Sequence, residues 1–361
     1  MCHEYSPTNK EKTMSLTSQH FGTTTDGQDI TQFTLTNSNN CQVKIITYGA
    51  IVTSITVPDR NGQMADVVLG HDTLEGYQNT PAYLGAVVGR YGNRIRNGQF
   101  ELNGQTYTLA TNNGPNHLHG GLQGFDKMVW QAEVDEPTQS VRLTHTSQSG
   151  HEGYPGTLTA QVTYTLTDNN ALQIKYHATT DQPTIVNLTN HSYFNLAGQG
   201  TIVDHTLKLN ASHFTPVDDT LIPTGELRPV QKTPFNFTTP IRIGDRIDAN
   251  DEQIRQGGGY DHNWVLDAWD QSLKEIAMLR APHSGRTMTV STTEPGVQFY
   301  TGNFLDGSVV GKGDQTYNKR TGLCLETQHF PNSPNQPNFP STTLNPGEEY
   351  RSETVYTFTT K

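Results

Sequence analysis

The sequence feature that most constrains the fold is a strict alternation of apolar and polar residues across 158–179. Every second residue from Leu158 to Leu166 is apolar, and the positions between them are Thr or Gln. After a polar break at 168–170, the alternation resumes from Leu172 to Ala178. Two such runs around a short Asn-containing turn predict an antiparallel hairpin that packs one face on a core.

Turn signals between apolar runs predict three further hairpins: Asn103-Gly104 within 99–109, Asn61-Gly62 between 51–57 and 67–69, and His283-Ser284-Gly285 within 276–291. Apolar spacing of three and four is confined to short windows, so we expect helical turns only around 72–78 and 244–255. The 51 Thr and 33 Gly residues also favour strands and turns over helices. Together these signals predict an all-β fold, a large antiparallel sandwich.

The 361 residues show no linker, repeat or step in composition, and β-sandwiches often exceed the average domain length. We therefore expect a polar N-terminal arm over 1–18 and a single domain over 19–361. The Pro- and Asn-rich segment 331–346 lies between two strand-like runs and is expected to form a long ordered loop or surface flap.

The net charge and the cysteine content limit which partners the protein can bind and which cellular compartment it can occupy. With 24 basic and 35 acidic residues, the net charge of −11 argues against nucleic acid or a membrane as a partner. Three scattered cysteines, Cys2, Cys41 and Cys324, indicate reduced thiols. The chain has no secretory h-region and no apolar run long enough to span a membrane. We therefore expect a cytoplasmic protein, either a monomer or a homodimer.

Six polar segments carry more His, Asn and charge than a bare sandwich needs: GRYGNRI (89–95), NHLHGG with GFDK (116–127), NHSYFNL (190–196), GGYDHN (258–263), PGVQFYTGNF (295–304) and LETQHFPNSPN (325–335). Taken singly, each His, Arg or carboxylate in them is more easily explained as a structural residue. In this order, however, they resemble the aldose 1-epimerase family, also called galactose mutarotases, from about residue 20 to the end.

This resemblance implies the large antiparallel sandwich of the galactose-mutarotase type, a small aldohexose as the substrate, and neither a cofactor nor a metal. It also implies that Glu326 is the general base and His191 the general acid. The residues that contact the sugar or line its pocket would be Asn93, Arg94, His119, Tyr193, Asp261 and Gln298. Gln298 lies at a position that varies within the family. Tyr193, Phe299 and Trp264 are candidates for an aromatic residue that stacks on the sugar.

The chemistry explains why these groups would be needed. Opening a cyclic hemiacetal removes a proton from the C1 hydroxyl and supplies one to the ring oxygen, which an acid and a base do together. His191 must then carry a proton at neutral pH. We expect negative charge from Glu326 or Asp261, in the same pocket, to raise the pKa of His191 from its reference value of about 6.5.

Four alternatives stay open at this point. A glycoside hydrolase would use Asp261 and Glu326 as paired carboxylates, and a jelly-roll metalloenzyme would use His117 and His119. A non-catalytic sugar-binding protein could share the scaffold. A hexose-6-phosphate epimerase would need basic residues around the pocket, for which the candidates are Arg90, Arg94 and Arg96.

Overall fold

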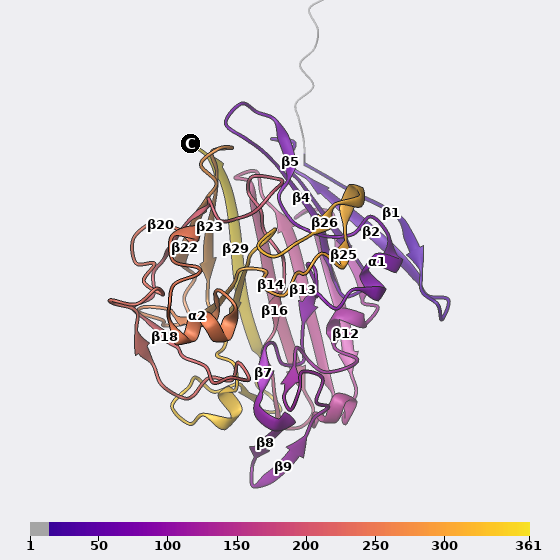
Figure 1. The fold of residues 1–361 in the computed structure, drawn as a ribbon. Helices are drawn as coiled ribbons and strands as arrows, with labels where there is room; N and C mark the ends of the chain where they lie inside the picture. The colour runs from indigo at the N-terminus through magenta and orange to yellow at the C-terminus, as the bar shows by residue number, and fades with distance from the viewer. Residues whose placement is uncertain (1–13) are drawn as a thin grey trace, which may run out of the picture.

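A nine-stranded antiparallel sheet forms one layer of the molecule (Figure 1). The structure is a computed structural model that describes residues 14–361. In spatial order its strands are β11 (Gln131–Asp135), β12 (Ser140–Ser147), β13 (Leu158–Leu166), β14 (Ala171–Thr180), β29 (Tyr350–Thr360), β23 (Arg286–Thr292), β22 (Lys274–Arg280), β17 (Thr206–Leu209) and β20 (Ile241–Arg242). The apolar side chains that alternate along β13 are fully buried, as the sequence predicts.

A five-stranded antiparallel sheet is built from consecutive strands: β1 (Ser15–Thr23), β2 (Asp29–Thr36), β3 (Gln42–Ile46), β4 (Val52–Pro58) and β5 (Met64–Asp66). Ser15 pairs with Thr36, so residues 15–18 belong to this sheet. The expected arm boundary at residue 18 is therefore too late, and residues 1–13 of the arm lie outside the described residues.

A second five-stranded sheet carries most of the polar motifs. Its strands are, in order, β19 (Arg228–Pro229), β18 (His213–Thr215), β21 (Asp261–Val265), β24 (Gly296–Tyr300) and β27 (Cys324–Gln328). All residues of β24 and β27 are buried. A strand buried on both faces is one whose polar side chains line an interior site or bond to one another.

Short pairs of strands brace the loops: β7 (Arg94–Ile95) with β10 (His117–Leu118), β6 (Val87–Val88) with β16 (Thr189–Asn190), β8 (Gln99–Leu102) with β9 (Gln105–Thr108), β15 (Thr184–Ile185) with β28 (Thr343–Leu344), and β25 (Val309–Val310) with β26 (Thr316–Tyr317). The α-helices of the described chain are the six-residue α1 (Leu74–Asn79) and α2 (Glu252–Gly257). Both agree with the helical turns expected around 72–78 and 244–255. The fold is therefore mostly β, as expected.

The predicted hairpins are present as β13–β14, β8–β9, β22–β23 and β4–β5. In the β8–β9 turn, Asn103 and Gly104 have φ values of 52° and 77°, which suit the tight turn that the Asn-Gly pair predicts. One strand begins earlier than expected, because β5 occupies 64–66. Of the buried residues 67–69 that follow, Val67 still donates its backbone N–H to the Ile55 carbonyl of β4 at 2.9 Å, and Val68 forms an isolated bridge with Phe194. The apolar character of 67–69 reflects burial in the core.

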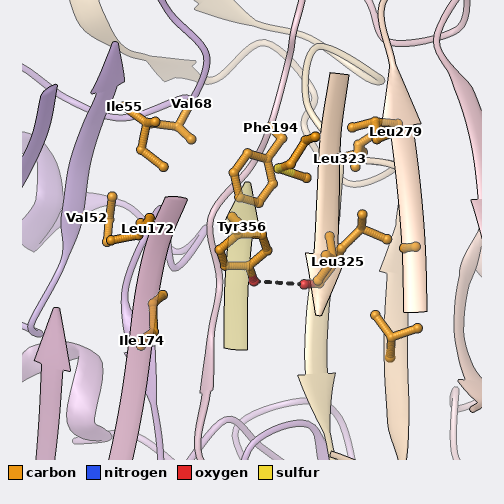
Figure 2. Packing of buried hydrophobic residues seen from close by; sticks show 14 of the residues in the cluster. Val52, Ile55, Val68, Leu172, Ile174, Phe194, Leu279, Leu323, Leu325 and Tyr356 are labelled. Atoms are coloured by element: carbon orange, nitrogen blue, oxygen red, sulfur yellow. Dashed lines mark hydrogen bonds between the residues drawn. The ribbon is translucent and has the colours of Figure 1, made fainter. Parts of the chain in front are cut away.

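The core lies between the nine-stranded sheet and the two five-stranded sheets, and one continuous cluster of buried side chains joins all three. Figure 2 shows Val52 of β4 beside Leu172 of β14, and Leu325 of β27 beside Tyr356 of β29. The Tyr356 hydroxyl also donates a hydrogen bond to the Leu325 carbonyl, 3.1 Å away. The shared core is the reason we infer a single domain.

The segment 331–346 is ordered and packs against the segment that carries Arg94 and Arg96. Its Asn332 is fully buried, and its backbone N–H donates to the Arg94 carbonyl at 2.7 Å. The Asn332 side-chain oxygen accepts from the Arg96 N–H at 3.0 Å. This segment therefore fixes the strand that carries Arg94 at the site.

Candidate active site

A cavity of about 660 Å³ opens beside the second five-stranded sheet, within the usual range of small-molecule sites. Loops at 81–83, 113–119, 219–221 and 304–309 form its walls. Seven of the eight expected site residues line its interior. They are Asn93, Arg94, His119, His191, Tyr193, Asp261 and Glu326.

The strand register places the site residues in two rows across β21, β24 and β27. Gln298 pairs with Asn263 on one side and with Glu326 on the other. In the second row, Tyr300 lies between Asp261 and Cys324. Residues two apart on a strand point to the same face, so both rows face the cavity side of the sheet.

Glu326 and His191 meet at the base of the cavity. Oε1 of Glu326 lies 3.7 Å from Nε2 of His191, and both side chains are almost wholly buried. Burial raises the pKa of Glu326 well above its ordinary value, and the charge of Asp261 raises it further, whereas Arg94 lowers it. The second oxygen, Oε2, is buried and has no hydrogen-bond partner among the described residues.

The pKa of His191 shifts in the direction opposite to the one expected from the sequence. Burial lowers it to about 4, because the imidazolium loses its hydration, and a backbone hydrogen bond opposes this shift only in part. The expected sharing of one pocket by His191, Glu326 and Asp261 is nevertheless correct. Burial also favours the neutral carboxyl of Glu326, so it disfavours the charged form of each member of the pair.

His119 covers the pair from the side. Its ring lies edge-on to that of His191, with 5.2 Å between the ring centroids. Nδ1 of His119 accepts a hydrogen bond of 3.1 Å from the Asn93 backbone N–H. Both residues have positive φ, 52° for His119 and 66° for Asn93, so a tight backbone arrangement presents their side chains to the cavity.

Arg94 is the one arginine of the GRYGNRIR segment in the cavity wall, where Asn113 accepts a hydrogen bond of 3.0 Å from its Nε. Arg90 is buried elsewhere and donates to the carbonyls of Pro155 and Gly156. Arg96 forms an ion pair of 2.7 Å with Asp218. The three arginines therefore do not form the basic cluster that a sugar phosphate would require.

Asp261 is held by Gln298, whose Nε2 donates to its Oδ1 at 2.8 Å. The sequence predicts that Gln298 lines the pocket. In the structure Gln298 is buried and is not part of the cavity wall, so this prediction is wrong. Burial raises the pKa of Asp261, while Arg94 and the hydrogen bond from Gln298 oppose this shift. Gln298 acts behind Asp261 and fixes its orientation.

Comparisons with known proteins agree with this geometry. The sequence model described as Aldose 1-epimerase matches residues 31–357. The galactose mutarotase of Sus scrofa is 46% identical over 349 residues, 96% of this chain and 99% of the relative. This chain belongs to the aldose 1-epimerase family. It is an enzyme of that family, an isomerase that acts at the anomeric carbon of aldoses.

Solved structures extend the likeness to the whole fold. A galactose 1-epimerase from Lactobacillus acidophilus NCFM is 29% identical with a TM-score of 0.85, covering 96% of this chain and 99% of that one. An aldose epimerase homologue from C. elegans is 34% identical with a TM-score of 0.82, covering 89% of this chain and 96% of that one. The expected mutarotase-type sandwich is confirmed.

In this aldose 1-epimerase, two of the three aromatic candidates do not reach the cavity. Phe299 and Trp264 are fully buried in the core. Phe299 follows Gln298, and Trp264 is three residues from Asp261, so both point to the opposite face of their strands. Tyr193 lines the cavity as expected, with its ring centroid 5.0 Å from that of His191.

The proposed metal ligand His117 also lies outside the site. Its Nδ1 is 2.6 Å from the Ala110 carbonyl and its Nε2 is 2.6 Å from the Tyr154 hydroxyl. Both ring nitrogens are therefore engaged in the protein. The jelly-roll reading with His117 and His119 as joint ligands is wrong, because His119 turns to the cavity in a left-handed conformation.

Sequence reasoning missed three residues that touch the site. Tyr83 lies in the wall, with its ring centroid 4.7 Å from that of His119. No motif marks it, and we find no sequence signal for it. Tyr300 and Cys324 each lie two residues from a predicted site residue on the same strand, and the period of two could have identified both.

The structure shows no helix within residues 14–361 that is long and apolar enough to cross a membrane.

Proposed function

We propose that the protein interconverts the α and β anomers of free hexoses, galactose and glucose among them, with Glu326 as base and His191 as acid. One observation carries the proposal: these two proton-handling groups lie 3.7 Å apart at the base of a single cavity. The hydroxyl oxygen and the ring oxygen of a hemiacetal are bonded to the same carbon. An acid and a base that serve both oxygens must therefore be close neighbours.

The reaction proceeds by proton transfers at the two oxygens. The step starts from the form of the pair in which one proton lies on His191 and Glu326 is a carboxylate. Glu326 removes the proton of the C1 hydroxyl, the bond between C1 and the ring oxygen breaks as the carbonyl forms, and His191 protonates the ring oxygen. Rotation about the C1–C2 bond then exposes the other face of the aldehyde. Closure returns both protons in the reverse sense, so the pair again holds one proton and no electrons are exchanged.

The remaining wall residues hold the sugar. Arg94 and His119 present nitrogen donors to the cavity, Asn93 presents an amide, and Asp261 presents a carboxylate that accepts hydrogen bonds from hydroxyls. Tyr193 supplies an aromatic surface beside His191. These groups suit a neutral polyhydroxylated ring, which offers donors and acceptors in every direction.

The charges of the cavity favour a free sugar over a sugar phosphate. Four carboxylate residues line it, whereas Arg94 is the one Lys or Arg side chain in the wall among residues 14–361; the carboxylates belong to Asp219, Asp261, Asp306 and Glu326. A phosphate dianion would meet net repulsion here. We also propose a cytoplasmic protein that works as a monomer or a homodimer, on the composition of the chain alone.

Polarimetry on freshly dissolved α-D-galactose and α-D-glucose tests the proposal. We expect Glu326→Gln and His191→Asn each to lose about 10²- to 10⁴-fold in kcat, because each removes one positioned proton-transfer group. Glu294→Gln is the matched control, since the buried Glu294 pairs with the partly buried His329 at 2.6 Å outside this cavity. It should keep its rate.

The same assays separate the alternatives. A glycoside hydrolase would release the chromophore from a chromogenic galactoside, and we expect no release. A binding protein would leave the optical rotation changing at its uncatalysed rate at every protein concentration. Normal turnover by Glu326→Gln with an intact fold would refute the assignment of the base.

A further inference from the structure

Phe304 is the most exposed large apolar side chain among residues 14–361, at 60%, and it lines the cavity on its solvent side. It is the last residue of the PGVQFYTGNF segment and has no part in the proton transfers described above. We propose that Phe304 stacks on the bound hexose and gives the enzyme a preference for galactose over glucose. This inference rests on the proposed function, because Glu326 and His191 fix the position of the sugar.

The loop that carries Phe304 is anchored on both sides of this residue. Asn303 Nδ2 donates a hydrogen bond to the Tyr260 carbonyl at 2.8 Å, and Leu305 is buried. The Phe304 backbone N–H donates to the Tyr300 hydroxyl at 2.9 Å. The protein thus holds the backbone and the neighbours of Phe304 while the phenyl ring stays exposed. Because burial of a phenyl ring is favourable, an exposed ring on an anchored loop beside a cavity offers a surface for a ligand to cover.

Aromatic rings connect Phe304 with the reacting end of the cavity. The Phe304 ring stacks on that of Tyr300, with 5.9 Å between the ring centroids and 24° between the ring planes. The Tyr300 ring centroid lies 6.4 Å from that of His191. Phe304 is therefore two ring contacts away from the general acid, a separation that one hexose ring and its hydroxyl groups can bridge. Tyr300 supports one face of the phenyl ring and leaves the other for the sugar.

The chemistry of ring opening fixes which end of the sugar meets Phe304. C1 and the ring oxygen must lie beside Glu326 and His191, at the base of the cavity. In a six-membered ring the C3–C4 edge lies opposite these two atoms, so it points to the open side of the cavity, where Phe304 lies. Galactose and glucose differ only in the configuration at C4. A residue at this place can therefore distinguish them.

An aromatic ring distinguishes the two sugars by their apolar faces. In galactose the axial O4 lies on one face of the ring, and the C–H groups of C3, C4 and C5 gather on the other. In glucose O4 is equatorial, and the C4–H points to the face opposite to the C3–H and C5–H. Galactose therefore offers the larger continuous C–H surface to a phenyl ring, whose electron-rich face attracts the positive edge of such groups.

Polarimetry with galactose and with glucose tests the inference. For Phe304→Ala we expect KM for galactose to rise about five- to tenfold, KM for glucose to rise no more than about twofold, and kcat to be kept for both sugars. Phe304→Trp keeps an aromatic face and should retain the preference for galactose. Val310→Ala is the matched control, because Val310 is also an exposed apolar residue and lies outside the cavity wall.

Calorimetric titration with galactose separates this inference from the proposed function, because it measures binding without turnover. Adding Phe304→Ala to Glu326→Gln should weaken galactose binding about five- to tenfold, which would support the stacking even if Glu326 were not the base. The inference is overturned if Phe304→Ala keeps the galactose KM, if it weakens both sugars equally, or if Val310→Ala reproduces its effect. Absence of mutarotation by the folded wild type would refute the proposed function alone and leave calorimetry with both sugars to decide the stacking.

Discussion

Cys324 Sγ lies 3.6 Å from Nδ1 of His191, on the side of the imidazole away from the Nε2 that faces Glu326. Cys324 and Glu326 are two residues apart on β27, so one strand face supports both nitrogens of the ring. Burial raises the pKa of Cys324 well above its ordinary value, so the thiol stays protonated and can donate to Nδ1. A neutral imidazole that accepts at Nδ1 carries its hydrogen at Nε2.

We therefore expect Cys324→Ala to lower kcat by about three- to tenfold with little change in KM, the range that the loss of one hydrogen bond allows. Cys324→Ser keeps a donor and should retain more of the rate. Steady-state polarimetry measures both. Cys41→Ala is the control, because Cys41 is a buried free thiol of the core outside the cavity. An equal loss of kcat in that control would indicate a general packing effect.

The pH profile of kcat/KM should report the lowered pKa of His191 and the raised pKa of Glu326. The acidic limb belongs to the uptake of a second proton, and burial lowers the pKa of His191 to about 4. The alkaline limb belongs to the loss of the last proton, which the raised pKa of Glu326 delays. Activity should therefore be kept above the ordinary His pKa of about 6.5, within about twofold from pH 5.5 to 7.5.

The contrary outcome is distinct. An imidazolium of ordinary pKa would lose about 90% of its protonated form by pH 7.5, and kcat/KM would fall about tenfold between pH 5.5 and 7.5. That fall, after subtraction of the buffer-catalysed rate, would show that other interactions of His191 offset the effect of burial in the working enzyme.

The sequence predicts the strands well, because alternation is a local signal that survives wherever one face of a strand is buried, as along β13. It places the start of one strand too late, at Val67 instead of Met64, because Met64 is exposed and the buried apolar run begins only at Val67. The motifs identify the chemistry, yet the pKa direction of His191 cannot be read from them. Nearby charges are visible in a sequence, whereas the depth of burial that reverses their effect is a property of the packed fold.

Gln298 supplies a prediction about orientation. Its Nε2 holds Asp261, and its Oε1 accepts from Gln328 at 3.2 Å, so Gln298→Leu leaves Asp261 without this donor. We expect KM for galactose to rise about three- to tenfold with kcat nearly kept. Polarimetric KM and kcat values test this. Gln32→Leu, which alters a buried Gln of the first five-stranded sheet, should leave KM unchanged.

Substitutions of Phe299 and Tyr83 should separate the residues that stabilise the fold from those that bind the sugar. Phe299 stacks on Tyr260 with 5.2 Å between the ring centroids and is fully buried. Phe299→Ala should cost about 3–5 kcal/mol of unfolding free energy, measured by urea denaturation, because it opens a cavity in the core. The molecules that stay folded should keep the KM of the wild type.

Tyr83 is expected to behave in the opposite way. It is half-buried in the cavity wall beside His119 and His191, so Tyr83→Ala removes surface that faces the sugar and little that packs the core. We expect KM to rise several-fold with a loss of unfolding free energy below about 1.5 kcal/mol. If Phe299→Ala raised KM and Tyr83→Ala did not, the sugar would stack against the core face of β24. The strand would then have to present Phe299 and Gln298 on one side, which the pleat of a regular strand forbids.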